Sequence, residues 1–344
     1  MSGVRRVRDL GEFGLIDLLR DALPAAVREA SAVALGIGDD AAVWQPASGE
    51  RVVITTDSLV EGVHFRLDWT GWGELGHKTL AVNVSDLAAM GAAPRLAVVT
   101  LALRGDEWVT DLLDLYRGLG DLAQREGMVV AGGDVVRSPH CLTFHVTALG
   151  ETRGGRVLTR SGARPGDRIG VTGTLGAAAA GLRLLELDRD PKRHATTAET
   201  LIAAHLRPQP RVAMGAALLA HGASSAMDLS DGLLGDLPKI LDASGASARI
   251  DAARVPVAAA VRALFPDDWL DLALRGGEDY ELLFTAAGDR WREIERAVAA
   301  VGGTVAAIGE VVPLHGGEPE IALVQLDGEV RRPRPGAFDH FSSG

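Results

Sequence analysis

The chain has 344 residues, of which 47% are apolar and 24% charged, and a formal net charge of -11. These values are typical of a globular protein with two domains or one large one. The acidic balance argues against a nucleic-acid binder, which usually carries a basic stripe. Cys141 is the only cysteine, which excludes an intramolecular disulfide and a cysteine-based zinc site. No signal sequence and no apolar run of roughly 20 residues is present, so we expect a cytoplasmic protein.

The first half of the chain alternates predicted strands and helices. We expect helices at 11–23, 74–90 and 107–125, and strands at 51–56, 96–103, 128–131 and 141–150. The strand at 51–56 is expected to end at Asp57, and the strand at 128–131 to run into Gly132, Gly133 and Asp134. Cys141 is predicted to be a buried, inert thiol inside a strand.

The segment 152–167 is rich in Gly, Arg, Ser and Pro, which indicates a domain boundary. We therefore divide the chain into an N-terminal domain, 1–151, and a C-terminal domain, 152–344. In the second domain we expect strands at 169–172, 226–229, 280–286, 305–311 and 321–326, and helices at 175–186, 197–205, 210–220, 233–243 and 290–301. The pattern predicts an α/β (α+β) protein.

Six short acidic motifs are the most informative feature of the chain. They read GIGDDAAV (36–43), TTDSLVEGVHF (55–65), NVSDLAAMGA (83–92), GGD (132–134), MDLSDG (227–232) and GGEDYEL (276–282). If they converge, their carboxylates repel one another by roughly 4 kcal/mol per pair at about 4 Å and an effective dielectric of about 20. Convergence therefore requires cations. Aspartates with hydroxyls and waters are the ligands of a hard cation, so we expect Mg²⁺ rather than Zn²⁺.

Asp86 is the most telling single residue, because it lies in a predicted helix among apolar side chains. An unpaired buried carboxylate costs several kcal/mol. Asn83 lies one turn away on the same face. Either this face lines a metal site or Asp86 pairs with an arginine, and the other acidic motifs favour the metal.

The other acidic motifs each have a structural alternative. Asp57 follows two threonines and either shares a metal with them or caps a turn. Asp40 lies on a turn, where an aspartate can bond to its own backbone. Ser230 or Asp231 is a natural helix N-cap, but capping does not explain Asp228 as well.

Two polar residues outside the aspartate set remain ambiguous. His64, between Val63 and Phe65, is either a packed core histidine or a contact for an anionic ligand. Arg160 is either a phosphate ligand or an exposed linker arginine.

Familiar catalytic motifs are not matched. Residues 36–41 fit only the first four positions of a dinucleotide fingerprint, and two aspartates would face the pyrophosphate. Residues 71–79 resemble a P-loop, but His77 adds a residue before the lysine and no apolar strand precedes it. The sequence shows neither an HExxH motif nor a Ser-His-Asp order, so covalent catalysis has no visible candidate.

Taken in order, GIGDD, TTDSLVEGVHF, VNVSDLAAMGA, GGD, LTRSGARPGD, MDLSDGL, GGEDYEL and a terminal FDHF resemble the bacterial thiamine-monophosphate kinase family over nearly the whole chain. The resemblance implies a two-domain aminoimidazole ribonucleotide synthetase-like fold, in which each domain is a mixed sheet packed with helices. It implies a homodimer whose N-terminal domains pair around a β-barrel. The implied reaction converts thiamine monophosphate and ATP into thiamine diphosphate and ADP, with several Mg²⁺ ions and without nucleic acid or membrane.

The resemblance also implies roles for individual residues. Metal ligands would be Asp40, Thr55, Thr56, Asp57, Asp86, Asp134, Asp228 and Asp231, of which Asp57, Asp86, Asp134 and Asp231 are the catalytic candidates. Nucleotide contacts would be Tyr116, Gly133, Asp134, Arg160 and Ser230, and substrate contacts His64, Glu278 and Phe338. Phe338 stands where the family often has tyrosine or tryptophan, which keeps an aromatic face for a cationic ring but removes a polar group.

Alternatives within and beyond the superfamily remain. Selenophosphate synthetase would show a reactive cysteine and a lysine near the N-terminus, and the hydrogenase maturation protein would end in cysteine; the chain has neither feature. Aminoimidazole ribonucleotide synthetase stays open as an alternative. A non-catalytic nucleotide sensor is disfavoured, because all eight metal positions carry oxygen side chains.

Overall fold

The computed structural model describes residues 5–28, 33–35, 43–187, 196–314 and 316–333. They form two compact units, unit 1 with Met1–Leu87 and Ala92–Gly155, and unit 2 with Ala88–Gly91 and Arg156–Gly344. The units therefore change over between Gly155 and Arg156. A functional division at 151 and 152 stays a proposal.

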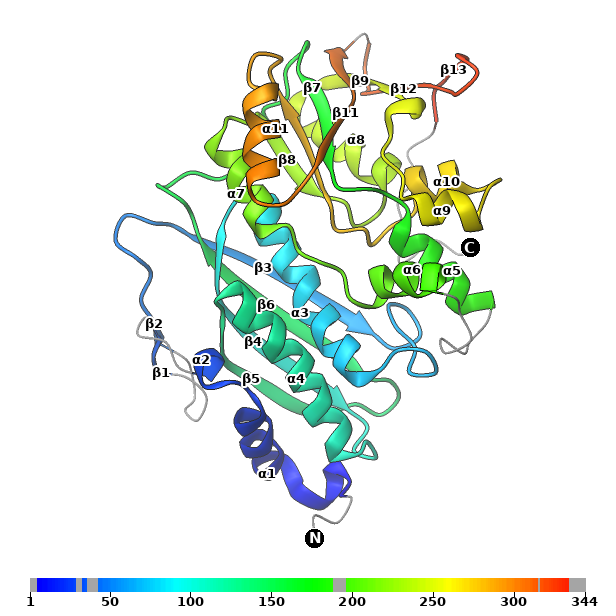
Figure 1. Ribbon diagram of the computed structural model, residues 1–344. Helices are drawn as coiled ribbons and strands as arrows, with labels where there is room; N and C mark the ends of the chain where they lie inside the picture. The colour runs from blue at the N-terminus through cyan, green and yellow to red at the C-terminus, as the bar shows by residue number, and fades with distance from the viewer. Residues whose placement is uncertain (1–4, 29–32, 36–42, 188–195, 315, 334–344) are drawn as a thin grey trace. The chain divides into compact units, whose positions relative to one another are not determined.

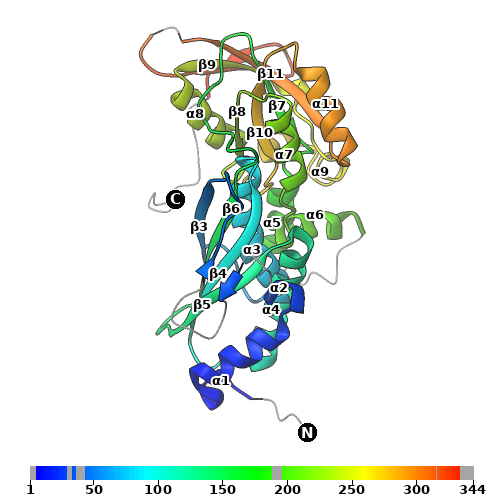
Figure 2. The same cartoon turned by 90° about the vertical axis from the view of Figure 1, so that its left-hand side faces the viewer.

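Unit 1 is built on a four-stranded mixed sheet covered on one face by two long helices (Figures 1 and 2). The strand order is β3 (Val52–Val60), β6 (Thr143–Glu151), β4 (Ala93–Leu103) and β5 (Val129–Arg137), with only β4 and β5 parallel. The covering helices are α3 (Trp72–Ala89) and α4 (Val109–Glu126). Alternate strand residues such as Phe144 and Val146 are fully buried beneath them. The remaining described elements are α1 (Val7–Ala22), α2 (Ala25–Arg28), β1 (Val33–Leu35) and β2 (Val43–Trp44).

Helices α3 and α4 approach each other closely because glycines lie at their contact. A Cβ atom at Gly118 would meet the carbonyl group of Gly73, and one at Gly76 would meet the carbonyl group of Leu115.

We expect Gly118→Ala to destabilise the protein by about 1–3 kcal/mol, because the two backbones would have to separate. Urea unfolding measures the change. Gly288→Ala is the matched control, since a Cβ there meets nothing within 4 Å; equal effects of the two substitutions would contradict the packing argument.

Unit 2 contains a seven-stranded mixed sheet with helices on both faces. The strand order is β13 (Val330–Arg331), β12 (Ile321–Val324), β9 (Ala246–Asp251), β11 (Val305–Pro313), β7 (Arg168–Thr172), β10 (Leu282–Ala286) and β8 (Ser225–Asp228), and only the β12–β9 pair is parallel. The helical elements are α5 (Ala177–Leu187), α6 (Thr196–Leu206), α7 (Val212–Ala220), α8 (Leu233–Ser244), η2 (Ala252–Arg254), α9 (Ala259–Leu264), α10 (Trp269–Arg275) and α11 (Trp291–Ala300).

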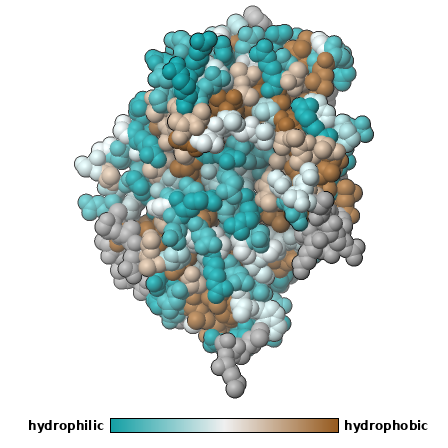
Figure 3. All heavy atoms as spheres, in the orientation of Figure 1, coloured by the Kyte–Doolittle hydropathy of each residue, from teal (hydrophilic) through white to brown (hydrophobic). Residues whose placement is uncertain are grey.

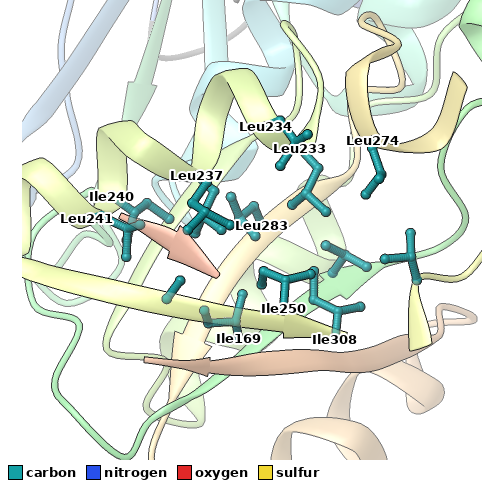
Figure 4. Close-up of a cluster of buried hydrophobic side chains, with 14 of the residues drawn as sticks. Ile169, Leu233, Leu234, Leu237, Ile240, Leu241, Ile250, Leu274, Leu283 and Ile308 are labelled. Carbon is teal, nitrogen blue, oxygen red and sulfur yellow. The ribbon is translucent and has the colours of Figure 1, made fainter. Parts of the chain in front are cut away.

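Neighbouring residues of β10 enter different cores, as the two-residue period of a strand requires. Leu283 packs in the cluster that α8 and α10 cover, with Leu237 and Ile250 among its members (Figure 4). Phe284 belongs to the cluster that α7 and α11 cover, and its ring stacks on Trp291 at a centroid distance of 5.5 Å. This double burial holds β8, β10 and the loops that follow them in place.

The expected elements are present, with three corrections that concern the acidic motifs and the cysteine. Strand β3 does not end at Asp57 but continues to Val60. Asp57 therefore lies inside the strand, where successive side chains alternate between the two faces of the sheet. Strand β5 likewise runs through Asp134 to Arg137. Cys141 lies before β6 rather than inside a strand, and it is partly exposed. Elements β9, α9 and α10 were not predicted, because short segments carry little periodicity.

Surface hydropathy and helix length are two features in which a protein with membrane-spanning helices differs from others. The face drawn in Figure 3 interleaves hydrophilic and hydrophobic residues. Among the described helices, none combines the length and the apolar character that crossing a bilayer requires.

Candidate functional site

The centre of the candidate site in unit 1 is formed by β3 and α3. Thr55 and Asp57 alternate onto the face of the sheet that the helices cover, and the hydroxyl of Thr55 donates a hydrogen bond to Oδ2 of Asp86. Asp86 lies in α3, as the sequence predicted. The hydroxyl of Thr55 is thus one partner of this carboxylate, and it joins residues of two motifs that lie 31 positions apart in the sequence.

The electrostatics of this cluster favour a cation. Loss of hydration and, second to it, the negative charge of Asp86 together raise the pKa of Asp57 to about 6, although the residue is partly open to solvent. Two neighbouring carboxylates thus lie together with a hydroxyl oxygen. Mg²⁺ is usually held by one or two carboxylates together with waters and substrate phosphates. The oxygen set of Asp57, Asp86 and Thr55 fits such an ion.

A complete protein cage for a metal is not formed within the part of the chain that the structure describes. There, no three His, Cys, Asp or Glu side chains come together as a metal-binding group.

The sheet separates Asp134 and Thr56 from the Asp57–Asp86 pair. Asp57 lies on edge strand β3 and Asp134 on edge strand β5, three strand spacings or roughly 14 Å across the sheet. Asp134 is exposed, and one of its oxygens accepts a hydrogen bond from the amide of Val135 at 2.8 Å. Thr56 points to the opposite face from Asp57 and accepts a hydrogen bond from the Thr147 hydroxyl at 3.1 Å. Unit 1 therefore does not bring these two residues to the same ion as Asp57.

Gly133 also meets a packing requirement that the sequence did not indicate. We expected the paired glycines to allow a ligand close to the backbone. In the structure a Cβ atom at Gly133 would meet the carbonyl group of Val99 on β4, so the close neighbour is a strand of the same sheet.

His64 and Tyr116 occupy different environments. Nδ1 of His64 accepts a hydrogen bond from the amide of Val60 at 3.1 Å, so Nε2 carries the proton of the neutral ring. His64 is half-buried and not a core residue. Tyr116 is buried in α4, and burial raises the pKa of its hydroxyl above the usual value. Its predicted nucleotide contact is not supported by this burial and stays a prediction.

Unit 2 gathers the MDLSDG and GGEDYEL motifs at the end of β8. Asp228 is the buried last residue of β8, and the amide of Glu278 donates to the carbonyl oxygen of Ser230 at 2.8 Å. Helix α8 begins at Leu233 with Gly232 as its N-cap and no side-chain cap. The capping alternative for Ser230 and Asp231 is therefore wrong.

The three acidic residues of GGEDYEL each have a different partner in unit 2. Oε2 of Glu278 lies 2.9 Å from Nδ1 of buried His205, and the Glu278 backbone has a φ of 66°, which is unusual for a residue other than glycine. Asp279 accepts hydrogen bonds from the amides of Gly176 and Ala178, but burial raises its pKa to about 7.

Glu281 forms a buried structural ion pair. The guanidinium of Arg211 donates to both of its carboxylate oxygens, at 3.0 and 2.6 Å, and the hydroxyl of Thr172 donates to it at 2.6 Å. This residue therefore stabilises unit 2 and is not a ligand candidate.

Sequence reasoning missed two residues beside Asp231. Nζ of Lys239 donates to Asp231 Oδ2 at 2.6 Å and to Asp236 Oδ1 at 2.8 Å. Partial burial lowers the pKa of Lys239, but the hydrogen bonds to the two carboxylates outweigh it and the pKa is raised. The i, i+3 spacing of Asp236 and Lys239 was a signal that the sequence carried. His205, which lies beside Glu278, was also missed, and no sequence pattern pointed to it.

Three of the predicted site residues remain to be placed. Asp40 and Phe338 lie outside the described residues. Arg160 is exposed in the segment that precedes β7.

Comparisons with known proteins give the family. "AIR synthase related protein, N-terminal domain" matches residues 38–152, and "AIR synthase related protein, C-terminal domain" matches residues 164–321. The chain is 40% identical over 343 residues to thiamine-monophosphate kinase of Escherichia coli strain K12, which covers 97% of this chain and 99% of that protein.

Solved structures agree. The crystal structure of thiamine-monophosphate kinase from Stenotrophomonas maltophilia K279a matches with a TM-score of 0.82 and 40% identity, and covers 94% of this chain and 98% of that chain. AaThiL complexed with AMPPCP and TMP matches with a TM-score of 0.75 and 32% identity, and covers 99% of this chain and 100% of that chain. The predicted two-domain fold of mixed sheets packed with helices is confirmed. The chain belongs to the thiamine-monophosphate kinase family of AIR synthase related proteins.

Proposed function

We propose that the chain transfers the γ-phosphoryl group of ATP directly to the phosphate of thiamine monophosphate, giving thiamine diphosphate and ADP. The substrates are those of the family, and AMPPCP and TMP are the ligands in the AaThiL complex. The observation that carries the mechanism is the meeting of Asp57, Asp86 and the Thr55 hydroxyl. This cluster suits a reaction between two phosphates, in which positioning and charge neutralisation supply most of the catalysis.

Asp57 and Asp86 would hold Mg²⁺ in unit 1, with Thr55 fixing the orientation of Asp86 through its hydrogen bond. Bound Mg²⁺ would neutralise the phosphate charges and orient them for in-line transfer. Asp228 and Asp231 are the corresponding carboxylates of unit 2, where β8 ends. Asp40, Thr56 and Asp134 remain proposed ligands on the strength of the family resemblance.

The acceptor needs no strong general base, because a phosphate monoester oxygen is already ionised near pH 7. The proton on Nε2 of His64 makes this ring a donor toward a phosphate oxygen, and the Val60 amide fixes the tautomer. Glu278, held beside His205, is the proposed contact for the thiamine part of the substrate. Arg160, Ser230, Gly133 and Tyr116 are the proposed nucleotide contacts, and Phe338 the proposed aromatic contact.

We further propose a cytoplasmic homodimer that pairs through the sheet of unit 1. The face of this sheet opposite to α3 and α4 carries Ile54 and Val136, whose exposed fractions are 64% and 42%. Exposed apolar residues on a sheet face favour pairing with another surface. Sedimentation analysis tests the assembly.

One assay tests the reaction. The protein is incubated with Mg-ATP and thiamine monophosphate, and we expect thiamine diphosphate and ADP in equal amounts. A nucleotide sensor would bind ATP without forming product. Quench-flow with γ-labelled ATP is expected to show no labelled protein, and a trapped phosphoenzyme would overturn direct transfer.

The raised pKa of Asp57 predicts a pH-dependent cation affinity. Protons and cations compete for this carboxylate, which is ionised above a pKa of about 6 and protonated below it. We expect the affinity for Mn²⁺, measured by electron paramagnetic resonance without nucleotide, to be constant above pH 7 and to fall as the pH drops through 6. In Asp57→Asn the fall between pH 7 and 5 should be largely lost. An unchanged pH profile in that variant would assign the proton to another ligand.

A further inference from the structure

Asp231 is held by a closed ring of hydrogen bonds within unit 2. Its amide donates to Asp236 Oδ2 at 2.9 Å, while Lys239 donates to Asp236 Oδ1 at 2.8 Å and to Asp231 Oδ2 at 2.6 Å. The ring therefore fixes both the backbone and the side chain of Asp231. Its three members come from the start of α8 and the turn before it.

Asp236 makes the ring rigid, because its side chain is fully buried and both of its oxygens are engaged. A buried carboxylate is retained at low cost only when it is paired and hydrogen-bonded. Lys239 itself is only partly buried, so its ammonium joins the buried Asp236 to the more accessible Asp231. Lys239 engages one of the two carboxylate oxygens of Asp231, Oδ2.

We propose that Lys239 and Asp236 are positioning residues, which hold one oxygen of Asp231 so that the other is presented to a divalent cation. This inference rests on the proposed function, in which Asp231 is a metal ligand. Partners that orient a ligating carboxylate typically contribute 10- to 100-fold to metal affinity or activity. Neither residue is placed in contact with substrate.

The test must separate positioning from folding. Lys239→Met alone leaves Asp236 buried without its cation, and the protein then loses stability. The informative variant is therefore Lys239→Met combined with Asp236→Asn, because the amide oxygen of asparagine still accepts from the Asp231 amide. The matched control removes an exposed ion pair of unit 2, with Arg249→Met and Glu310→Gln.

Two readouts are taken with the full-length protein. Binding of Mn²⁺ alone, measured by electron paramagnetic resonance without nucleotide, should weaken roughly tenfold in the Lys239/Asp236 double variant. In steady-state kinetics of thiamine diphosphate formation with Mg-ATP, kcat should fall roughly 10- to 100-fold while KM for thiamine monophosphate stays within about twofold. The control variant should match wild type in both, and Lys239→Arg should restore most of the Mn²⁺ affinity because it keeps a cationic donor.

A double-mutant cycle gives the sharpest evidence. In an Asp231→Asn background, the Lys239/Asp236 substitutions should cause no further loss of Mn²⁺ affinity, since the ring acts through Asp231. An additive loss would overturn the proposal, as would unchanged or increased Mn²⁺ affinity of the double variant. If wild type forms thiamine diphosphate and the double variant matches it in Mn²⁺ affinity and in kcat, only the positioning role fails. If wild type neither binds Mn²⁺ nor forms product, the proposed function fails and this inference fails with it.

Discussion

Replacing Asp57 by asparagine is expected to lower kcat by roughly 10³-fold or more, equivalent to about 4 kcal/mol of lost transition-state stabilisation. Asparagine keeps the shape of the side chain but removes the charge that would hold a cation beside Asp86. The fold should remain intact, because the two carboxylates raise each other's energy in the absence of a cation. Steady-state kinetics with saturating Mg-ATP and circular dichroism measure the two effects.

Asp121→Asn is the matched control for this variant, since it removes the same charge from an exposed position of α4 in unit 1. Its kcat should equal that of wild type. Near-normal turnover of Asp57→Asn would remove Asp57 from the catalytic site. Loss of the circular dichroism signal would show that the residue acts on folding instead.

Replacing Arg211 by alanine is expected to destabilise the protein by about 3–5 kcal/mol, because Glu281 would be left buried without its cation. Glu281 is only 3% exposed, and each of its carboxylate oxygens accepts a hydrogen bond from the Arg211 guanidinium. Water cannot replace them without opening the packing around β10. Urea unfolding at pH 7.5, followed by circular dichroism, measures the shift of the midpoint.

Arg331→Ala supplies the comparison, because it breaks an exposed ion pair with Glu329 in the same unit. Pairs of this kind contribute at most about 1 kcal/mol. Equal midpoints for Arg211→Ala and Arg331→Ala would show that the Glu281 pair is relaxed by solvent or by another partner.

Local pattern was sufficient to predict part of the arrangement of the acidic motifs. Asp86 was expected to lie within a helix, and α3 confirms this. The threonine and aspartate of TTD were expected near the same ion as Asp86, and the Thr55–Asp86 hydrogen bond together with the electrostatic interaction of Asp57 and Asp86 brings them together. The alternation of strand residues then placed Thr56 on the other face.

Other parts of the site depended on contacts between distant residues. Arg211 and Glu281 are seventy positions apart, and His205 and Glu278 are also far apart along the chain. A local pattern carries no information about such pairs, because a buried carboxylate can be balanced by any cation that the fold brings near it. The same limit hid the reason for Gly133, whose close neighbour is a residue of β4.

By itself, the sequence determined most of the longer helices and strands, the mixed α/β character and the six motifs that mark the family, since these follow from local periodicity and from residue types at fixed spacing. Only the tertiary structure decided which carboxylates are ligand candidates and which are structural. Asp57 lies beside a second carboxylate, which makes it a candidate ligand for a cation, whereas Glu281 already has a cationic partner in Arg211. The physical reason is that the charge balance of a buried group depends on its neighbours in space, and packing selects those neighbours.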